Sequence, residues 1–255
     1  MDNSIISPKA KIDESVQIGP FCYISDQVEI GEGTWIGPHV TIYDYVKIGK
    51  NCKIFPGAVI GAIPQDLKFA GEVSYVEIGD NTTIREYATI NRGTAASGKG
   101  TTKIGNNSLI MSYCHVAHDC KIGDHCIMTS YAGLAGETDI DDWAIIGGGT
   151  LAHQFSKIGA HAMIGGCCAI AKDVPPFILA ARVPLAYEGI NIVGLRRRGF
   201  SNEDIEIIGK IYDIIYKSGY NVTDALKIVE ECYPGNVHAK TIVDFIRNSK
   251  RGIVK

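Results

Sequence analysis

One short segment of the sequence is well suited to acid–base chemistry. It reads His115-Val116-Ala117-His118-Asp119-Cys120 and places a carboxylate directly after its second histidine. A neutral imidazole can take a proton from a sugar hydroxyl near neutral pH, and a neighbouring carboxylate favours the imidazolium that forms. We therefore predict that His118 is a general base assisted by Asp119. Because Val116 is expected to point inward, His118 should lie in the turn beyond it, exposed at a corner.

A six-residue period sets the elements that position this segment. An aliphatic residue recurs at every sixth position from Ile6 to Ile60, again from Ile78 to Ile90, and, after a shift of two residues, from Ile104 to Ile170. A period of six fits neither an amphipathic helix nor a plain alternating strand, and it is typical of a parallel β-helix. Three short strands joined by tight turns then complete each coil, with the aliphatic residues inside.

The period also predicts which residues stack on one another. With eighteen residues per coil, two columns about 5 Å apart from coil to coil are expected: His118, Gly136 and Gln154 in one, and Ser130, Gly148 and Gly166 in the other. A turn without a side chain beside a base leaves room for a thioester carbonyl, and the Gly136 N–H is a candidate oxyanion donor. His153 lies next to this column. The second column predicts a groove narrow enough for an acyl chain, although plain turn geometry would give the same glycines.

Two interruptions of the period are expected to project as loops from a β-helical domain of residues 1–176. Residues 61–75 carry Gln65, Asp66 and Lys68 in one short stretch, and residues 91–102 are rich in Gly, Ser and Thr. Three polar groups so close together favour a binding role for the first loop. The second is either functional or a tolerated insertion.

Helical patterns replace the period after residue 176, so we expect a small helical domain over residues 177–255. Ser201 and Asp204 resemble a capping box at the start of one helix, and Thr223 is expected to cap the next. A third helix should cover residues 239–249. An arginine triplet, Arg196 to Arg198, precedes these helices and is either a solvated helix face or a site for phosphate or an acidic protein.

Composition excludes several classes of protein. The 255 residues carry 45% apolar content and a net charge of −3, so overall charge favours neither a nucleic acid nor a membrane surface as partner. No apolar run is long enough to span a membrane, and the first residues lack a signal-peptide core, so a cytoplasmic protein is expected. Most of the eight cysteines occupy the small inward position of the repeat, which predicts reduced core thiols.

Taken together, the sequence resembles the acyl-[acyl-carrier-protein]:UDP-N-acetylglucosamine O-acyltransferases, the family that catalyses the first step of lipid A biosynthesis. The matching segments follow one another in order and span nearly the whole chain. They are Gln65-Asp66-Leu67-Lys68, Arg92-Gly93-Thr94, His115 to Cys120, Ala144 to Gly148, His153-Gln154-Phe155, Gly159-Ala160-His161, Asn191-Ile192, Gly194-Leu195 and Arg197 to Phe200. The related N-acyltransferases carry an extra domain before their repeats, which is disfavoured here because the period begins at Ile6.

The resemblance implies a left-handed parallel β-helix with a helical C-terminal domain, assembled as a homotrimer whose sites lie between neighbouring prisms. It implies transfer of an (R)-3-hydroxyacyl chain from acyl carrier protein to the 3-hydroxyl of UDP-N-acetylglucosamine, without a metal or cofactor. His118 would be the base, Gly136 the oxyanion donor and Gly166 a determinant of acyl length. Other residues would hold the nucleotide sugar or the acyl-phosphopantetheine arm: Asp66, Lys68, His115, His153, Gln154, Asn191 and Arg197. The arginine triplet, Arg198 included, would aid the approach of the acidic carrier protein.

The sequence departs from the resembled family at two places. Glu137 stands where familiar members have a histidine near the substrate, and Ala181-Arg182-Val183-Pro184 lacks a Gly-Asn pattern, so contacts at both places differ.

Two other classes of protein are alternatives. Trimeric β-helical carbonic anhydrases bind zinc through histidines, and His115, His118, His125, His153 and His161 are candidates for that chemistry. A non-catalytic scaffold would need a flat face of repeated threonines. The same base and oxyanion donor would also serve a sugar with a 3-amino group, so the sequence leaves open whether the acceptor atom is oxygen or nitrogen.

Overall fold

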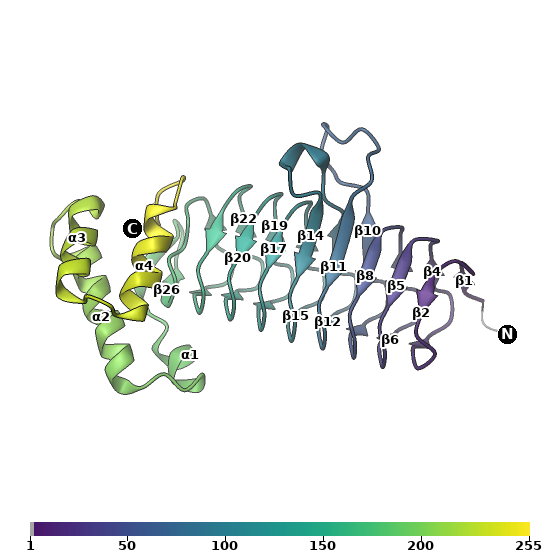
Figure 1. Ribbon diagram of the computed structural model, residues 1–255, viewed down its shortest axis with the longest axis horizontal. Helices are drawn as coiled ribbons and strands as arrows, with labels where there is room; N and C mark the ends of the chain where they lie inside the picture. The colour runs from purple at the N-terminus through teal and green to yellow at the C-terminus, as the bar shows by residue number, and fades with distance from the viewer. Residues whose placement is uncertain (1–2) are drawn as a thin grey trace.

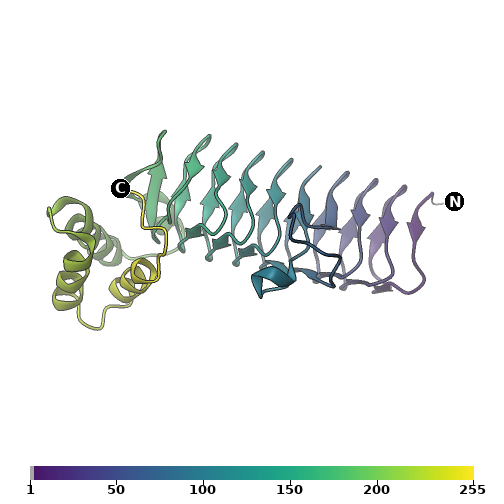
Figure 2. The ribbon, with the colours of Figure 1, turned by 90° about the horizontal axis from the view of Figure 1, so that it is seen from above.

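The chain winds into a three-sided parallel β-helix that ends in a small group of helices (Figures 1 and 2). This computed structural model describes residues 3–255, so residues 1 and 2 of the expected first domain lie outside the described part. The N-terminal coil lies at one end of the long axis and the helices lie at the other, as Figure 1 shows. The expected fold class, a β-helix followed by a helical region, is confirmed.

Three sheets form the sides of the prism. The first sheet contains nine strands: β1 (Ile5–Ile6), β4 (Tyr23–Ile24), β7 (Thr41–Ile42), β10 (Val59–Ala62), β13 (Thr89–Asn91), β16 (His115–Val116), β19 (Gly133–Leu134), β22 (Leu151–Ala152) and β25 (Ala169–Ile170). The second contains eight: β2 (Lys11–Ile12), β5 (Val28–Ile30), β8 (Val46–Ile48), β11 (Tyr75–Ile78), β14 (Thr101–Ile104), β17 (Lys121–Ile122), β20 (Asp139–Ile140) and β23 (Lys157–Ile158). The third contains ten: β3 (Gln17–Ile18), β6 (Trp35–Ile36), β9 (Lys53–Ile54), β12 (Thr83–Ile84), β15 (Leu109–Ile110), β18 (Ile127–Met128), β21 (Ile145–Ile146), β24 (Met163–Ile164), β26 (Ile178–Ala181) and β27 (Ala186–Ile190).

The periodic aliphatic residues fill the interior of the prism. From Ile24 to Ile170 they are buried, whereas Ile6 at the open N-terminal end is 39% exposed. Burying an isoleucine side chain contributes about 1.5–3 kcal/mol, so this internal column supplies much of the stability. The six cysteines at the small inward position are buried, as predicted, while Cys167 and Cys232 are exposed.

The three edges of the prism are named here by the sheets that they join. The first corner connects the first sheet to the second and includes Asp119, the second corner connects the second sheet to the third and includes Trp143, and the third corner connects the third sheet to the first and includes Tyr131. One residue in most turns adopts a left-handed conformation, such as Asp119 with φ of 60°. Aspartate tolerates this region better than branched residues do.

Both interruptions of the period project from the first corner in successive coils. The first loop covers residues 63–74 between β10 and β11, and the second loop covers residues 92–100 between β13 and β14. The second loop contains a short helix, η1 (Ala95–Ser97), for which the Thr94 side chain accepts a hydrogen bond from the Ser97 N–H. Figure 1 shows the two loops side by side above the middle of the prism, immediately before the coil of His118.

The prism continues past residue 176, where the sequence led us to expect helices alone. β26 pairs in parallel with β24, and β27 returns antiparallel to β26 as a hairpin. The hairpin breaks the six-residue period, and for that reason the sequence pattern missed it. Its turn contains Arg182, which forms an ion pair of 2.6 Å with Glu188.

Four helices follow instead of three: α1 (Ile192–Arg197), α2 (Asn202–Lys217), α3 (Val222–Cys232) and α4 (Val237–Arg247). The predicted capping box of Ser201 and Asp204 is present at the start of α2. Thr223 is not a cap, because Asn221 accepts the hydrogen bond from the Asp224 N–H and begins α3 two residues earlier. α4 likewise begins before the expected residue 239, behind Asn236. Among residues 3–255, no helix is both long and apolar enough to cross a membrane.

Candidate active site

His118 and Asp119 form a buried pair at the first corner. His118 Nδ1 lies 2.8 Å from Asp119 Oδ2, and the Asp119 side chain is fully buried. A carboxylate accepts hydrogen bonds, so it selects the tautomer that carries the proton on Nδ1. Nε2 is then left with a free lone pair, which is the state that a general base requires.

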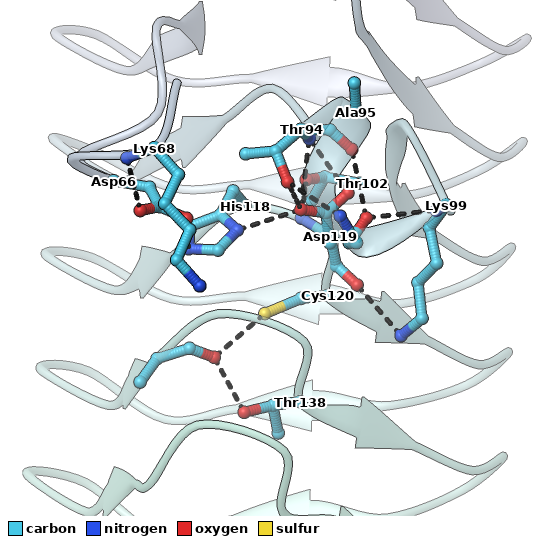
Figure 3. Close-up of polar contacts among 12 residues, drawn as sticks. Asp66, Lys68, Thr94, Ala95, Lys99, Thr102, His118, Asp119, Cys120 and Thr138 are labelled. Carbon is cyan, nitrogen blue, oxygen red and sulfur yellow. Dashed lines mark hydrogen bonds and ion pairs between the residues drawn. The ribbon is translucent and has the colours of Figure 1, made fainter. Parts of the chain in front are cut away.

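His118 is buried, not exposed at its corner as the sequence suggested, because the two loops fold over it. Only 7% of its surface is accessible. Nε2 faces the first loop, where Asp66 Oδ2 lies 3.7 Å away (Figure 3). Asp66 also accepts the Lys68 N–H at 2.9 Å, and the Lys68 side chain extends beside the imidazole. The first loop therefore brings one acidic and one basic group to the His118 imidazole.

The second loop holds Asp119 in place. The Thr94 N–H lies 3.0 Å from both carboxylate oxygens, and the Thr94 hydroxyl donates to Oδ2 at 2.8 Å. The Asp119 N–H donates to Thr102 Oγ1 at 2.8 Å. Lys99 reaches along the corner and donates to the Asp119 carbonyl at 3.1 Å and to Asp139 Oδ1 at 2.9 Å. Figure 3 shows the contacts of Thr94, Thr102 and Lys99 with Asp119 on one side of the imidazole and Asp66 on the other.

Two further contacts fix the loops. Glu72 of the first loop accepts the Ala95 N–H of the second at 2.9 Å, and backbone hydrogen bonds lower the pKa of this carboxyl. Gly93 packs so tightly that a Cβ atom would lie 2.3 Å from the Gly100 carbonyl carbon and 2.7 Å from Asp119 Oδ1. Only glycine fits at this position.

Gly136 lies directly against the imidazole, as the coil period predicted. A Cβ atom on Gly136 would lie 2.4 Å from His118 Nε2 and Cε1. Within residues 3–255 the Gly136 N–H has no hydrogen-bond acceptor, so it is available to an oxygen atom of a substrate. Gln154 follows one coil further on, since the Phe155 N–H donates to the Gly136 carbonyl at 3.1 Å.

His115 lies on the outer face of the first sheet, in β16, and His153 lies in the turn that follows β22 of the same sheet. His115 Nδ1 lies 2.7 Å from Thr89 Oγ1, and burial lowers the pKa of its imidazole. His153 is exposed, and its Nδ1 lies 3.0 Å from the Gln154 carbonyl. Gly166 is at the third corner, at the far side of the first sheet, where a Cβ atom would lie 3.1 Å from the Gly148 carbonyl oxygen.

The remaining predicted site residues are at the second corner or near it, away from His118 of the same chain. Asn191 caps α1 by accepting the Gly194 N–H at 3.1 Å and donates to the His161 carbonyl at 3.0 Å. Arg197 is exposed on α1. Arg198 is half-buried, stacks 5.3 Å from the centre of the Trp143 ring and lies 3.3 Å from His161 Nδ1. The structure therefore does not leave the whole arginine triplet in solvent.

The histidines considered for zinc are divided between separate parts of the surface. His125 and His161 belong to a stack of rings at the second corner, on either side of Trp143, with ring centres 3.9 Å and 6.2 Å from it. His115 and His118 lie at or next to the first corner and already have their own partners. In the described part of the chain, no group of three or more His, Cys, Asp and Glu residues could hold a metal ion.

The fold defines a hexapeptide-repeat protein, and comparisons with known proteins define its class as the hexapeptide transferases. A family model for the bacterial transferase hexapeptide matches residues 9–42, 27–62 and 101–136, and a model described as UDP-N-acetylglucosamine O-acyltransferase, domain 2, matches residues 173–254. A protein named acyl-[acyl-carrier-protein]–UDP-N-acetylglucosamine O-acyltransferase from a Sulfurihydrogenibium species is 51% identical over 98% of this chain and 92% of its own. One of the same name from Janthinobacterium is 45% identical over 99% and 97%.

Solved structures agree with these relatives. The UDP-N-acetylglucosamine acyltransferase of Bacteroides fragilis superposes with a TM-score of 0.97 at 55% identity, covering 99% of this chain and 98% of its own. That of Francisella novicida gives 0.96 at 42% identity, covering 100% and 93%. This likeness confirms the left-handed β-helix. The chain belongs to the acyl-[acyl-carrier-protein]–UDP-N-acetylglucosamine O-acyltransferase family and is an acyltransferase.

Replacing Gly136 with alanine should impair catalysis far more than folding. The added methyl group would overlap the His118 ring and displace its Nε2. A displacement of about 1 Å at a reacting group can cost about 10²-fold in rate, and we expect a loss of that size. Acyl transfer and thermal unfolding should be measured together. Gly209→Ala is a control in α2, where the nearest atom to the new Cβ lies at 3.8 Å; wild-type rates in Gly136→Ala would contradict the placement of the base.

His161 should make stability dependent on pH. Burial, together with the Arg198 guanidinium, lowers the pKa of this imidazole to about 4, against the opposing charge of Asp142. An unfolded chain would bind a proton near the ordinary value of about 6.5, so stability should be lost as pH falls from about 6.5 towards 4. His161→Phe keeps the ring stack but cannot titrate. Its unfolding temperature should fall less between pH 7 and pH 5 than that of the wild type, and equal slopes would contradict the assignment.

Proposed function

We propose that this enzyme transfers an (R)-3-hydroxyacyl chain from acyl carrier protein to the 3-hydroxyl of UDP-N-acetylglucosamine, the first step of lipid A biosynthesis. The names of its relatives support this reaction. The observation that carries the mechanism is the buried His118–Asp119 pair, with Nε2 turned towards Asp66 and Gly136. A base oriented by a carboxylate, next to a free backbone donor, suits attack of a hydroxyl on an acyl carbonyl.

The proposed reaction has two steps. His118 Nε2 removes the proton from the 3-hydroxyl as its oxygen attacks the thioester carbonyl carbon, and the Gly136 N–H donates to the oxyanion that forms. The tetrahedral intermediate then collapses, the C–S bond breaks, and the imidazolium returns the proton to the departing thiolate. Asp119 stabilises the imidazolium between these steps from 2.8 Å. Asp66, 3.7 Å from Nε2, and Lys68 would hold the sugar nucleotide beside the base.

His118→Ala should lower the rate of acyl transfer by about 10²–10⁴, the usual contribution of a general base. The assay combines purified enzyme, (R)-3-hydroxyacyl carrier protein and UDP-N-acetylglucosamine, with mass spectrometry of the product. The same assay with a 3-amino sugar acceptor decides which acceptor atom is acylated faster. His39→Ala is a matched control, because His39 is an exposed histidine at the third corner. Near-normal activity of folded His118→Ala would reject the mechanism.

We also propose that the enzyme is a homotrimer, on the basis of a sharp difference between its faces. In the second sheet, the outward residue directly before each inward isoleucine is charged: Lys11, Glu29, Lys47, Glu77, Lys103, Lys121, Asp139 and Lys157. The outward residues of the third sheet that precede its inward residues from β15 to β26 are apolar: Leu109, Ile127, Ile145, Met163 and Leu179. The third corner beside them presents Tyr87, Tyr113 and Tyr131 as a stack of exposed rings. A surface with this many apolar and aromatic side chains suits contact between subunits.

A trimer would also explain why the predicted site residues are divided within one chain. Asn191 and Arg197 lie beyond the second corner, so they would serve the His118 of a neighbouring subunit. The acyl chain would lie over the first sheet, where Gly133 leaves the surface low beside Leu151, and extend towards Gly166 at the third corner. An exposed Gly166 leaves that end open, which favours long acyl chains.

Mixing two inactive variants tests this shared site. His118→Ala and Arg197→Ala should each lose activity, whereas trimers that contain both kinds of chain should regain it. In such a trimer, an intact His118 can meet an intact Arg197 from the adjacent subunit. Co-expression with two affinity tags, followed by purification of mixed trimers and assay, provides the measurement. If mixed trimers stay as inactive as the single variants, each chain must supply its own complete site.

A further inference from the structure

Thr94 has no assigned part in the reaction, yet it supplies most of the hydrogen bonds to the buried carboxylate behind the base. Within residues 3–255, the donors to the Asp119 carboxylate are the Thr94 N–H, the Thr94 hydroxyl and His118. Thr94 is 1% exposed and Asp119 is 0% exposed. Water therefore does not compensate for the loss of either partner, and a buried carboxylate without donors is strongly disfavoured.

The direction of the Thr94 hydroxyl is also fixed. Its oxygen accepts the Ser97 N–H at 3.3 Å, so its single proton points to Asp119 Oδ2 at 2.8 Å. Oδ2 is the same oxygen that faces His118 Nδ1 at 2.8 Å. A hydroxyl donor and an imidazole donor thus share one carboxylate oxygen, and the rotation of the carboxylate determines where the imidazole lies.

We propose that Thr94 is a positioning residue for the acyl transfer: its hydroxyl orients Asp119, and Asp119 orients and stabilises the His118 imidazole. Within residues 3–255, Thr94 makes no hydrogen bond to His118, and its proposed effect passes through Asp119. The role rests on the proposed function of His118 as the base. It also assigns a task to the second loop, which brings Thr94 over the corner and is anchored on its far side by Lys99.

Thr94→Val removes the hydroxyl while keeping the shape and the backbone N–H. We expect kcat to fall about tenfold, the scale of one hydrogen bond to a charged group, with KM for both substrates unchanged. Thr94→Ser restores the hydroxyl and should restore kcat. If the valine methyl group is not accommodated, Thr94→Ala removes the hydroxyl without adding a group, and the same result is expected.

Thr82→Val is a matched control. Thr82 is also fully buried, and its hydroxyl donates to the Gly105 carbonyl at 2.7 Å and accepts the Ser108 N–H at 3.1 Å. It lies at the second corner, away from the base, so its loss should lower the unfolding temperature without lowering kcat. This comparison separates a positioning role from a general loss of stability.

A double-mutant cycle tests whether Thr94 acts through Asp119. In an Asp119→Ala background, Thr94→Val should lower kcat no further, because its target is absent. Wild-type kcat in folded Thr94→Val, or an equal loss of kcat in the Asp119→Ala background, would overturn the proposal. If His118→Ala retains activity, the proposed function itself fails; if His118→Ala is inactive and Thr94→Val is normal, only the role of Thr94 fails.

Discussion

The parallel register between successive coils is the constraint on which the rest of this structure depends. Each inward isoleucine pairs with its equivalent in the next coil, as Ile104 does with Ile122 and Ile122 with Ile140. A slip of one residue would turn this core outward and cost the burial of every coil, so the register is fixed strongly. That register places Gly136 against His118, and no binding energy at the site is needed to bring them together.

The two loops complete the surroundings of His118, which the prism alone would leave exposed to solvent. A turn of a β-helix holds its residues at the surface, and His118 without the loops would be solvated like other corner residues. The first loop adds Asp66 and Lys68 in front of the imidazole, and the second adds Thr94 behind Asp119. Their exclusion of water strengthens the hydrogen bond between His118 and Asp119, because electrostatic interactions grow as the local dielectric falls.

The sequence predicted those features that follow from periodicity. The core, the stacking of Gly136 on His118 and the capping box of α2 could all be derived, because each depends on spacing along the chain. Burial of His118 and the contacts of Thr94 could not, since they depend on how two irregular loops fold over a corner. The β26–β27 hairpin was missed because it has no six-residue period. Thr223 was wrongly chosen as the cap of α3 because both it and Asn221 are residue types that begin helices, and asparagine is the better of the two.

The tautomer of His118 decides whether its Nε2 can act as the base. Protein labelled with ¹⁵N at its seven histidines can be compared with His118→Gln, so that the His118 ring nitrogens are identified by difference. We expect the neutral ring to carry its proton on Nδ1, facing Asp119, and to leave Nε2 unprotonated. A proton on Nε2 in the resting enzyme would contradict this expectation, because that nitrogen could not then accept the hydroxyl proton.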